Sequence, residues 1–169
     1  MASSHDGRLL AAGERDRFAY VYDVASGKLL AKLDHREEET QVLRIRPVVF
    51  SPSGRRLASL TRDPTFLEEE SAFTLHVFDL STRNEIIRTT LNDLPRGLWF
   101  SPDEKAVEIA FGRRNLRLER FPLGAEELLR SACARVGRNL DETEWERYMS
   151  GMTFRRTCTA INPAARVIP

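Results

Sequence analysis

Short apolar stretches with a period of two recur along the first 122 residues of the chain. Three such pairs are Ala19 and Val21, Leu75 and Val77, and Leu116 and Leu118. A spacing of two places both members of a pair on one face of a β-strand. The pattern predicts ten strands, near residues 8–13, 18–23, 28–33, 45–50, 56–60, 73–79, 85–91, 96–100, 105–111 and 116–121.

A serine-led turn recurs at residues 4–7, 51–54 and 101–104. Each turn is followed by a basic residue and a short apolar run, and neighbouring turns stand about fifty residues apart. Proline presets φ in such a turn, and glycine lets the chain turn back at a positive φ. Several short strands in a repeat of this length predict a radial array of four-stranded antiparallel sheets.

The repeats divide the chain into three copies, near residues 4–41, 42–92 and 93–122. The second copy is longer because of an acidic insertion at 63–72, whose charge and proline favour an exposed loop. We therefore predict an all-β fold over residues 1–122, followed by a tail of a different pattern at 123–169.

A second kind of turn follows the aromatic strand of the first two copies. Asp23 and Asp79 open these turns, where an aspartate accepts hydrogen bonds from backbone N–H groups. Gly27 in the first copy and Asn84 in the second are residues that tolerate a positive φ. We predict a structural role for both aspartates.

These motifs resemble the WD-repeat β-propeller family. The residues that carry the resemblance are 50–55 (Phe-Ser-Pro-Ser-Gly-Arg), 100–103 (Phe-Ser-Pro-Asp) and the aromatic-Asp pairs at 22–23 and 78–79. The pairs stand where the family has Trp-Asp, and the third copy has Glu119-Arg120 there. The family's Gly-His dipeptide is absent, although Asp34-His35 stands near its place. Over residues 4–122 the resemblance implies an incomplete propeller of about three four-stranded blades, two of them partial.

After residue 122 the apolar period becomes that of an amphipathic helix. The apolar positions of this helix are Ala125, Leu128, Leu129, Ala132, Cys133 and Val136. Two glutamates lie in its first turn, where their negative charges interact favourably with the positive end of the helix dipole. Gly137 is a natural C-terminal stop. We therefore predict a first tail helix that ends before Gly137.

A capping box predicts a second, short helix near residues 142–149. Asp141 has Glu144 three residues later, which is the spacing of the box. Leu140 and Trp145 occupy the two positions of a hydrophobic staple, so we expect them to anchor the tail. The residues expected to be buried are Trp145, Tyr148 and Met149.

The tail resembles the segment that follows the last blade of many large bacterial WD-repeat proteins. The residues that carry this resemblance are Ala132, Cys133, Arg138, Asn139, Leu140, Glu144, Trp145, Tyr148, Thr157 and Cys158. In those proteins the propeller is a C-terminal sensor joined to an upstream signalling NTPase, kinase or effector, and the tail packs beside the final blade. The resemblance implies that this chain is the C-terminal part of such a signalling protein. The remaining blades would then be supplied in cis or in trans.

A propeller closes with four to eight blades, and the chain supplies fewer than three. The first copy lacks its inner strand, because Met1 falls where that strand should be, and the third copy lacks its outermost strand. Both ends of the arc are then expected to present unpaired strand edges. Three explanations stay open: a fragment or misplaced start, assembly with another chain, or an edge covered by the tail helices.

Cys133 and Cys158 are too few for a disulfide-stapled secreted scaffold. We expect them to come close together as the second helix folds back. In a reducing cytosol, two buried thiols are the simpler interpretation, and a disulfide is the alternative.

Composition narrows the class of protein. Hydrophobic residues make up 41% of the chain and charged residues 30%, which is typical of a folded globular protein. The net charge of +1 gives no global field to gather nucleic acid or an anionic membrane. Because no long apolar segment or N-terminal signal is present, we expect a cytoplasmic protein without a membrane partner.

The sequence holds no recognisable catalytic constellation. His5, His35 and His76 lie in different repeats without metal-binding spacing, so we expect turn or rim histidines and no metal site. No phosphate-binding glycine loop or nucleophile elbow is present. We therefore expect neither a catalytic residue nor a cofactor.

The leading hypothesis is a non-catalytic protein-interaction or sensor module, a scaffold whose partner is a protein or peptide. One candidate contact surface is Phe66 and Leu67 in the acidic insertion, since loops on a rigid scaffold carry function. The alternative is a nucleic-acid or phosphate-contacting surface on the third copy, formed by Arg113, Arg114 and Arg117. The aromatic residues expected of a base-stacking platform are missing there, which makes nucleic acid the weaker hypothesis.

Overall fold

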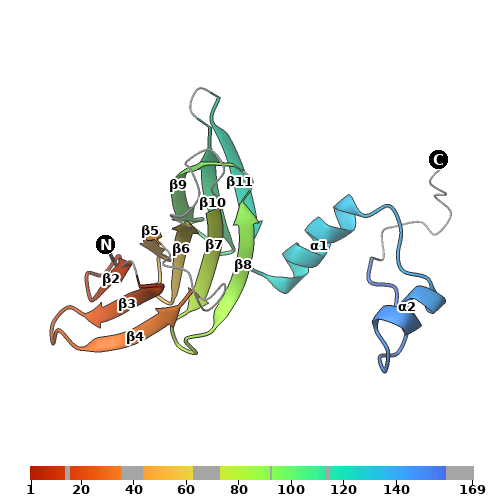
Figure 1. Cartoon of the computed structure of the whole chain (residues 1–169), viewed down its shortest axis with the longest axis horizontal. Coiled ribbons are helices and arrows are strands. Elements are labelled where there is room, and N and C mark those ends of the chain that lie inside the picture. Colours follow the sequence, from red (N-terminus) through yellow and green to blue (C-terminus); the bar gives the residue numbers. More distant parts are fainter. Residues whose placement is uncertain (14–15, 36–43, 63–72, 92, 113–114, 159–169) are drawn as a thin grey trace. The chain divides into compact units, whose positions relative to one another are not determined.

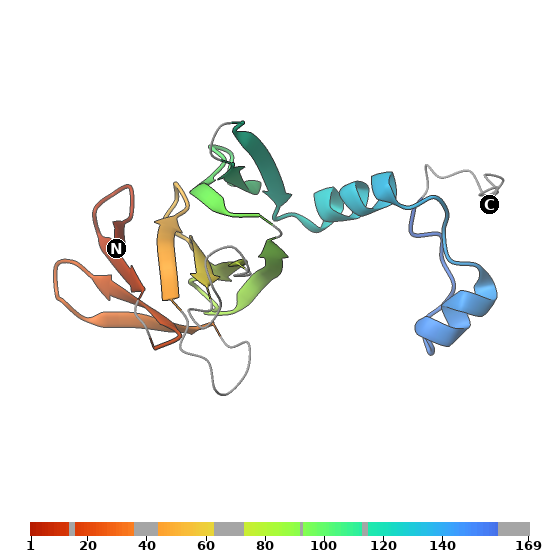
Figure 2. The ribbon, with the colours of Figure 1, turned by 45° about the horizontal axis from the view of Figure 1, so that its top comes forward.

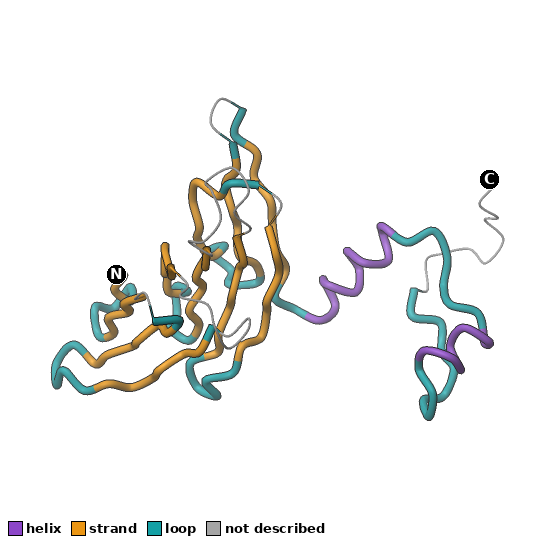
Figure 3. Tube along the Cα trace, viewed as in Figure 1, coloured by secondary structure: helices purple, strands orange, loops and turns teal. Residues whose placement is uncertain are grey.

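The computed structural model of the chain describes residues 1–13, 16–35, 44–62, 73–91, 93–112 and 115–158. The chain divides into two compact units, Met1–Leu123 and Gly124–Pro169. The first unit contains the strands and the second contains two helices (Figure 3). The expected all-β fold with a small helical tail is thus confirmed.

Three antiparallel sheets make up the first unit (Figure 1). The first sheet has the order β1 (Ala2–Ser3), β2 (Leu9–Gly13), β3 (Phe18–Asp23) and β4 (Leu29–Asp34). The second has the order β5 (Arg44–Phe50), β6 (Arg56–Arg62), β7 (Phe73–Asp79) and β8 (Glu85–Leu91). The third has the order β9 (Pro95–Phe100), β10 (Ala106–Phe111) and β11 (Arg117–Pro122).

The ten predicted strands are all present, and β1 is an addition to them. The sequence led us to expect no inner strand in the first copy, and this was wrong. Ala2 pairs with Ala11 and Ser3 with Leu10, so a two-residue strand forms beside β2. The stretch is too short for its period to be recognised in the sequence.

The serine turns have the same backbone hydrogen bonds in all three copies. In each copy the backbone N–H of the first serine donates to the carbonyl five residues later, and its carbonyl accepts the N–H three residues later. These serines are Ser4, Ser51 and Ser101. The last residues of the turns, Gly7, Gly54 and Glu104, have φ of 69°, 70° and 56°. The repeat seen in the sequence is therefore a repeat of backbone geometry.

The third copy departs from the others at the end of β11. Phe121 lies opposite Val107, as Tyr22 lies opposite Leu10, so Phe121-Pro122 occupies the aromatic-Asp position. Our sequence placement of Glu119-Arg120 there was therefore wrong by two residues. In the first two sheets the N–H of the aspartate begins a hairpin to a fourth strand. Pro122 has no N–H, which explains why β11 is not followed by such a hairpin.

The second sheet is buried on both faces. Strands β6 and β7 each contain five consecutive buried residues, as expected for strands covered from both sides. One apolar cluster fills the space between the first and second sheets, and another fills the space between the second and third. Figure 2 shows the three sheets following one another in chain order.

The inner strands bring the sheets into contact. Strand β5 packs against β1 and β2 on one side and against β9 on the other. Gly13 allows the closest approach, because a Cβ atom there would lie 2.6 Å from the carbonyl oxygen of Ile45. A side chain at this position would push β2 away from β5.

The second unit contains α1 (Ala125–Arg135) and α2 (Glu142–Tyr148). No residue of α1 is buried, although the helix is amphipathic as predicted. Neither of these two described helices is long and apolar enough to span a lipid bilayer.

Arg83 provides a test of the turn geometry. It has a φ of 60° at the place that Gly27 occupies in the first copy, whereas we had expected Asn84 to take up this conformation. A left-handed conformation is costly for a residue with a Cβ atom. We expect Arg83→Gly to raise the free energy of unfolding by about 1 kcal/mol, measured by urea denaturation. Arg83→Ala keeps the strained Cβ and serves as the control; equal stability of the two variants would contradict the prediction.

Candidate functional site

A basic residue stands at the same exposed position after each serine turn. These residues are Arg8, Arg55 and Lys105. Their carbonyl groups accept the backbone N–H of Val24, Leu80 and Leu123, so the backbone of each is fixed in the same way. Within the described part of the chain, none of the three side chains forms an ion pair. The fold therefore presents three equivalent cations whose side chains are available to a ligand.

The same hydrogen bonds place both kinds of turn at one end of the sheets. We call this end the turn rim and define it by residues 4–8, 23–28, 51–55, 79–84 and 101–105. The last residues of β2, β6 and β10 and the first residues of β3, β7 and β11 lie at the opposite end. The rim thus runs across all three sheets of the first unit.

The aspartates of the turn rim are engaged by their own turns. The Asp23 carboxylate accepts hydrogen bonds from the hydroxyl and the N–H of Ser26, and these bonds lower the pKa of Asp23. Asp79 accepts from the hydroxyl and N–H of Ser81 and from the N–H of Thr82, with the same effect on its pKa. Both aspartates thus occupy the turns in which we predicted them.

Direct contacts join the second and third serine turns. The Glu104 carboxylate accepts hydrogen bonds from the N–H and the hydroxyl of Ser53, the latter at 2.8 Å. The Arg56 guanidinium donates to the Glu104 carbonyl at 2.9 Å. This part of the turn rim is therefore a continuous, hydrogen-bonded surface.

Two of the three histidines are buried in the interior of the first unit, so our expectation of turn or rim histidines is wrong for these two. The rings of His35 and His76 are buried, with centroids 4.8 Å apart. His35 Nδ1 donates to the Leu33 carbonyl at 3.1 Å, which leaves Nε2 to accept the Ser59 hydroxyl at 2.7 Å. Burial, and secondarily the charge of His76, lowers the pKa of His35 to about 4.

His76 connects a hydroxyl to a carboxylate. Its Nδ1 donates to Glu85 Oε1 at 2.6 Å, and its Nε2 accepts from the Thr61 hydroxyl at 2.8 Å. Burial raises the pKa of Glu85, but hydrogen bonds from His76 and Arg88 outweigh this and lower it. The order hydroxyl, imidazole, carboxylate is that of a nucleophilic triad. Thr61 is only 2% exposed and His76 is fully buried, so the geometry gives the cluster a structural role between sheets.

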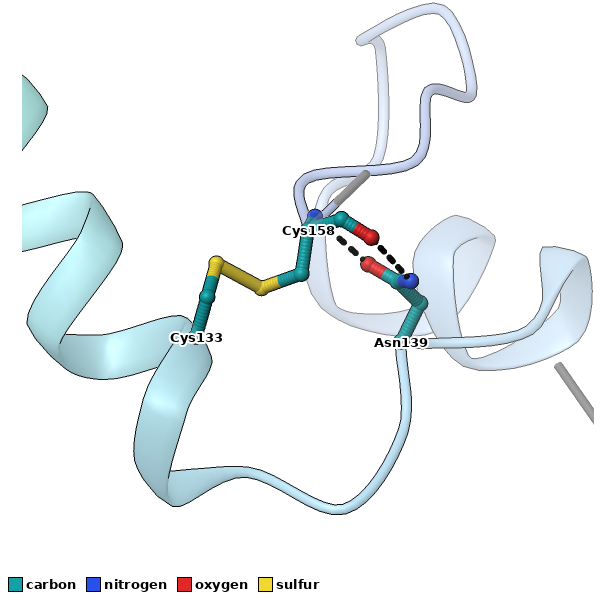
Figure 4. The surroundings of a disulfide bond; sticks show 3 residues. All are labelled: Cys133, Asn139 and Cys158. Carbon is teal, nitrogen blue, oxygen red and sulfur yellow. Dashed lines mark hydrogen bonds between the residues drawn. A yellow bond between two sulfur atoms is a disulfide. The ribbon is translucent and has the colours of Figure 1, made fainter. Parts of the chain in front are cut away.

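The structure joins Cys133 and Cys158 in a disulfide, so the simpler interpretation of two thiols is wrong (Figure 4). The side chain of Asn139 accepts the N–H of Cys158 at 2.8 Å and donates to its carbonyl at 2.9 Å. These two bonds hold Cys158 beside the chain that enters α2. A pocket of about 530 Å³ lies next to the disulfide. Its lining includes Leu129, Ala132, Val136 and Leu140.

The capping box of α2 forms as the spacing predicts. The Asp141 carboxylate accepts the N–H of Glu144 at 2.8 Å, and the Glu144 carboxylate accepts the N–H of Asp141 at 3.1 Å. Two hydrogen bonds from Arg138, helped by the one from Asp141, lower the pKa of Glu144 to about 2.

Trp145 is the buried residue of α2, and Tyr148 is not. The Trp145 indole N–H donates to the Met152 carbonyl at 2.9 Å, and Phe154 packs edge-on at 5.8 Å between ring centroids. Tyr148 is 66% exposed, so our expectation that it is buried was wrong. Leu140 is exposed, so our expectation that it anchors the tail together with Trp145 was wrong. Met149, which we expected to be buried, is only partly so. The segment after α2, which has no helical period, provides the cover for Trp145.

The proposed contact surfaces are described only in part. Phe66, Leu67, Arg113 and Arg114 lie outside the described residues. Arg117 lies 3.0 Å from Glu119 and 3.9 Å from Asp93, so neighbouring carboxylates offset its charge. Arg120 is likewise paired with Glu108 at 3.0 Å and lies 3.8 Å from Asp103.

Sequence reasoning missed the histidine cluster. The available signal was the alternation of Ser59, Thr61 and, on the next strand, Thr74 and His76, with apolar residues at the positions between them. Polar residues at buried strand positions need partners. Here Thr61 is bonded to His76, and Ser59 to His35.

No family model matches the chain, and no curated protein matches its sequence.

The low pKa of His35 predicts a pH-dependent stability. Between pH 6.5 and about 4 the unfolded chain binds a proton at this histidine that the folded chain excludes. The free energy of unfolding should therefore fall by about 3 kcal/mol as the pH is lowered through this window. Urea denaturation at several pH values measures it. His35→Asn should remove most of the loss, whereas His5→Ala should keep it; a loss that survives His35→Asn would refute the assignment.

The disulfide closes a loop with a sequence separation of 25 residues. Cross-linking a loop of this length lowers the entropy of the unfolded tail by the equivalent of about 3 kcal/mol. We expect Cys133→Ser with Cys158→Ser to increase amide hydrogen exchange in residues 138–158, with no change in the sheets. Adding a reducing agent to the wild type should reproduce this pattern. Unchanged exchange in both cases would contradict a stabilising disulfide.

Proposed function

We propose that the chain is a non-catalytic protein-interaction module of the WD-repeat type, in which the three sheets are adjacent propeller blades. Its turn rim binds an acidic segment of a partner protein. The part of the partner that binds would lie across the rim and place carboxylates near the equivalent cations.

The arrangement of the sheets supports the blade interpretation. Each sheet runs outward in chain order from its first strand, and the first strands β1, β5 and β9 are neighbours through β5. The aromatic-Asp turns at Asp23 and Asp79 lie at equivalent places. His35 and Ser59 form a hydrogen bond between the end of one copy and the second strand of the next. Together with the sequence resemblance to the family, these features support the interpretation of the three sheets as propeller blades.

The recurrence of Arg8, Arg55 and Lys105 carries the proposal for the binding surface. Equivalent hydrogen bonds hold the backbone at these three residues, so the three side chains leave the backbone at equivalent places in the three sheets. The aspartates of the same rim accept hydrogen bonds within their own turns, whereas none of these three cations forms an ion pair within the described residues. Rigid loops that carry repeated, available charges suit recognition by shape and charge complementarity.

The charge distribution favours a protein over nucleic acid as the partner. The net charge is +1, and two of the described arginines of the third copy, Arg117 and Arg120, are paired with carboxylates. Nucleic-acid binding relies on many unpaired cations that neutralise phosphates. Three separated cations fit a short acidic peptide better.

Selection from a displayed peptide library tests this function. We expect the wild-type chain to select acidic peptides. We expect the variant Arg8→Glu, Arg55→Glu, Lys105→Glu to bind them at least about tenfold more weakly, because exposed ion pairs are worth up to about 1 kcal/mol each. Fluorescence anisotropy with a selected peptide measures the change.

The matched control is Arg130→Glu, Arg155→Glu, Arg156→Glu, which reverses three exposed charges in the second unit. This variant should bind like the wild type. Selection of no peptide, or equal weakening in both variants, would reject the turn rim as the binding surface.

A further inference from the structure

The second unit contains few buried side chains. Trp145 is 5% exposed and Cys158 is 7% exposed, and among the described residues of this unit no other is buried. Cys158 is itself one half of the disulfide with Cys133. A unit as short as Gly124–Pro169 rarely holds its structure by an apolar core alone and depends on a staple. Within the described part of this unit, the disulfide is that staple.

The segment between α2 and Cys158 covers Trp145. The Met152 carbonyl accepts the hydrogen bond of the Trp145 indole at 2.9 Å, and the Phe154 ring packs edge-on against the indole. Residues 149–158 contain no helix or strand, so the place of this segment depends on the contacts of its individual residues. The cover of Trp145 therefore depends on what holds Cys158, at the end of the segment, in position.

Two connections hold Cys158 (Figure 4). The disulfide joins it to Cys133 in α1 across a sequence separation of 25 residues. The Asn139 side chain, just before α2, accepts the N–H of Cys158 and donates to its carbonyl. Without the disulfide only these two hydrogen bonds stay, and each is weak beside the conformational entropy that the segment gains on release. Breaking the sulfur link is therefore expected to free the segment from Trp145.

The disulfide adjoins open space within the second unit. Both cysteines line the pocket of about 530 Å³ described above, and the other residues that line it belong to the same unit. Its walls include the apolar side chains of Leu129 and Val136 as well as Asn139. Within this unit, a small thiol reagent can therefore approach the disulfide from the pocket.

We propose that the Cys133–Cys158 disulfide is a redox modification site, and that its reduction by a dithiol opens the second unit and uncovers Trp145. One thiolate of the dithiol attacks a sulfur of the disulfide, forms a mixed disulfide and releases the other cysteine as a thiolate. The second thiolate of the reagent then attacks the mixed disulfide and releases the second cysteine. The dithiol supplies two electrons and leaves as a disulfide. Its two thiol protons pass to water, and the two cysteine thiolates take up two protons in return.

This switch uses residues of the second unit alone. Peptide binding at the turn rim uses residues of the first unit, so the two proposals are tested separately. A second unit that does not respond to reduction would overturn the switch and leave the turn rim as a separate question.

Tryptophan fluorescence tests the opening. The chain has two tryptophans, and Trp99→Phe removes the one in the first unit, so the signal then comes from Trp145. We expect dithiothreitol to move the emission maximum to longer wavelength and to increase quenching by acrylamide, because the indole loses its cover. Titration should find two thiols per chain after reduction, and oxidation with glutathione disulfide should restore the original emission.

The matched control is Cys133→Ser with Cys158→Ser in the same Trp99→Phe background. Its emission should resemble that of the reduced chain and should not respond to dithiothreitol. Emission that stays unchanged while two thiols appear would overturn the switch, because Trp145 would then stay covered without the disulfide. A chain in which glutathione disulfide forms no bond between the two cysteines would remove the modification site itself.

The Asn139 hydrogen bonds provide a second, independent test. If they form in the oxidised chain and are lost on reduction, they must by linkage favour the disulfide over the two thiols. We expect Asn139→Ala to lower the equilibrium constant for disulfide formation, measured against glutathione, by about tenfold, since it removes two hydrogen bonds. This change corresponds to a reduction potential about 30 mV higher.

Asn84→Ala makes the same substitution in the first unit and should leave this equilibrium constant unchanged. The blue-shifted emission of Trp145 checks that the oxidised Asn139→Ala chain keeps its structure. If it does not, Phe154→Ala, which removes part of the cover of Trp145, replaces it with the same expected direction. An equilibrium constant equal to that of the wild type would mean that these contacts survive reduction, and the proposed opening would be wrong.

Discussion

Burial of the second sheet on both faces is the constraint on which the structure of the first unit depends. Strands β6 and β7 are covered from two sides, so each flanking sheet must supply an apolar face at the right distance. Gly13 allows the close approach on one side. The few polar groups that enter this region, on Ser59, Thr61 and His76, are acceptable because they bind one another and His35. Packing and polar pairing therefore act together at the junction of the first two sheets.

Much of this arrangement follows from the sequence, because strands and tight turns are local. The period of two located the ten longer strands, and the serine-led turns located the repeat. The register of β11 could not be obtained in this way, since the hairpin before it differs in length from the others. Only pairing with β10 shows that Phe121-Pro122 ends the strand. The two-residue β1 is too short for any period to mark it.

The candidate sites likewise combine features that the sequence predicts with features that only the fold determines. The position of a basic residue after each serine turn is visible in the sequence, but the availability of its side chain depends on the hydrogen bonds that engage the nearby aspartates. The histidine cluster joins residues from 35 to 85 and depends on how two sheets meet, which no local pattern encodes. In the tail, the capping box was predictable, whereas the cover of Trp145 by Phe154 comes from a segment without a regular period.

The link between Cys133 and Cys158 makes the segment between them a closed covalent ring. A protease that cuts this ring once produces no separate fragment, because the two pieces are still joined through sulfur. The tail can therefore lose the continuity of its backbone and keep its parts together. In an oxidising medium this would protect its integrity, and in a reducing one that protection would disappear.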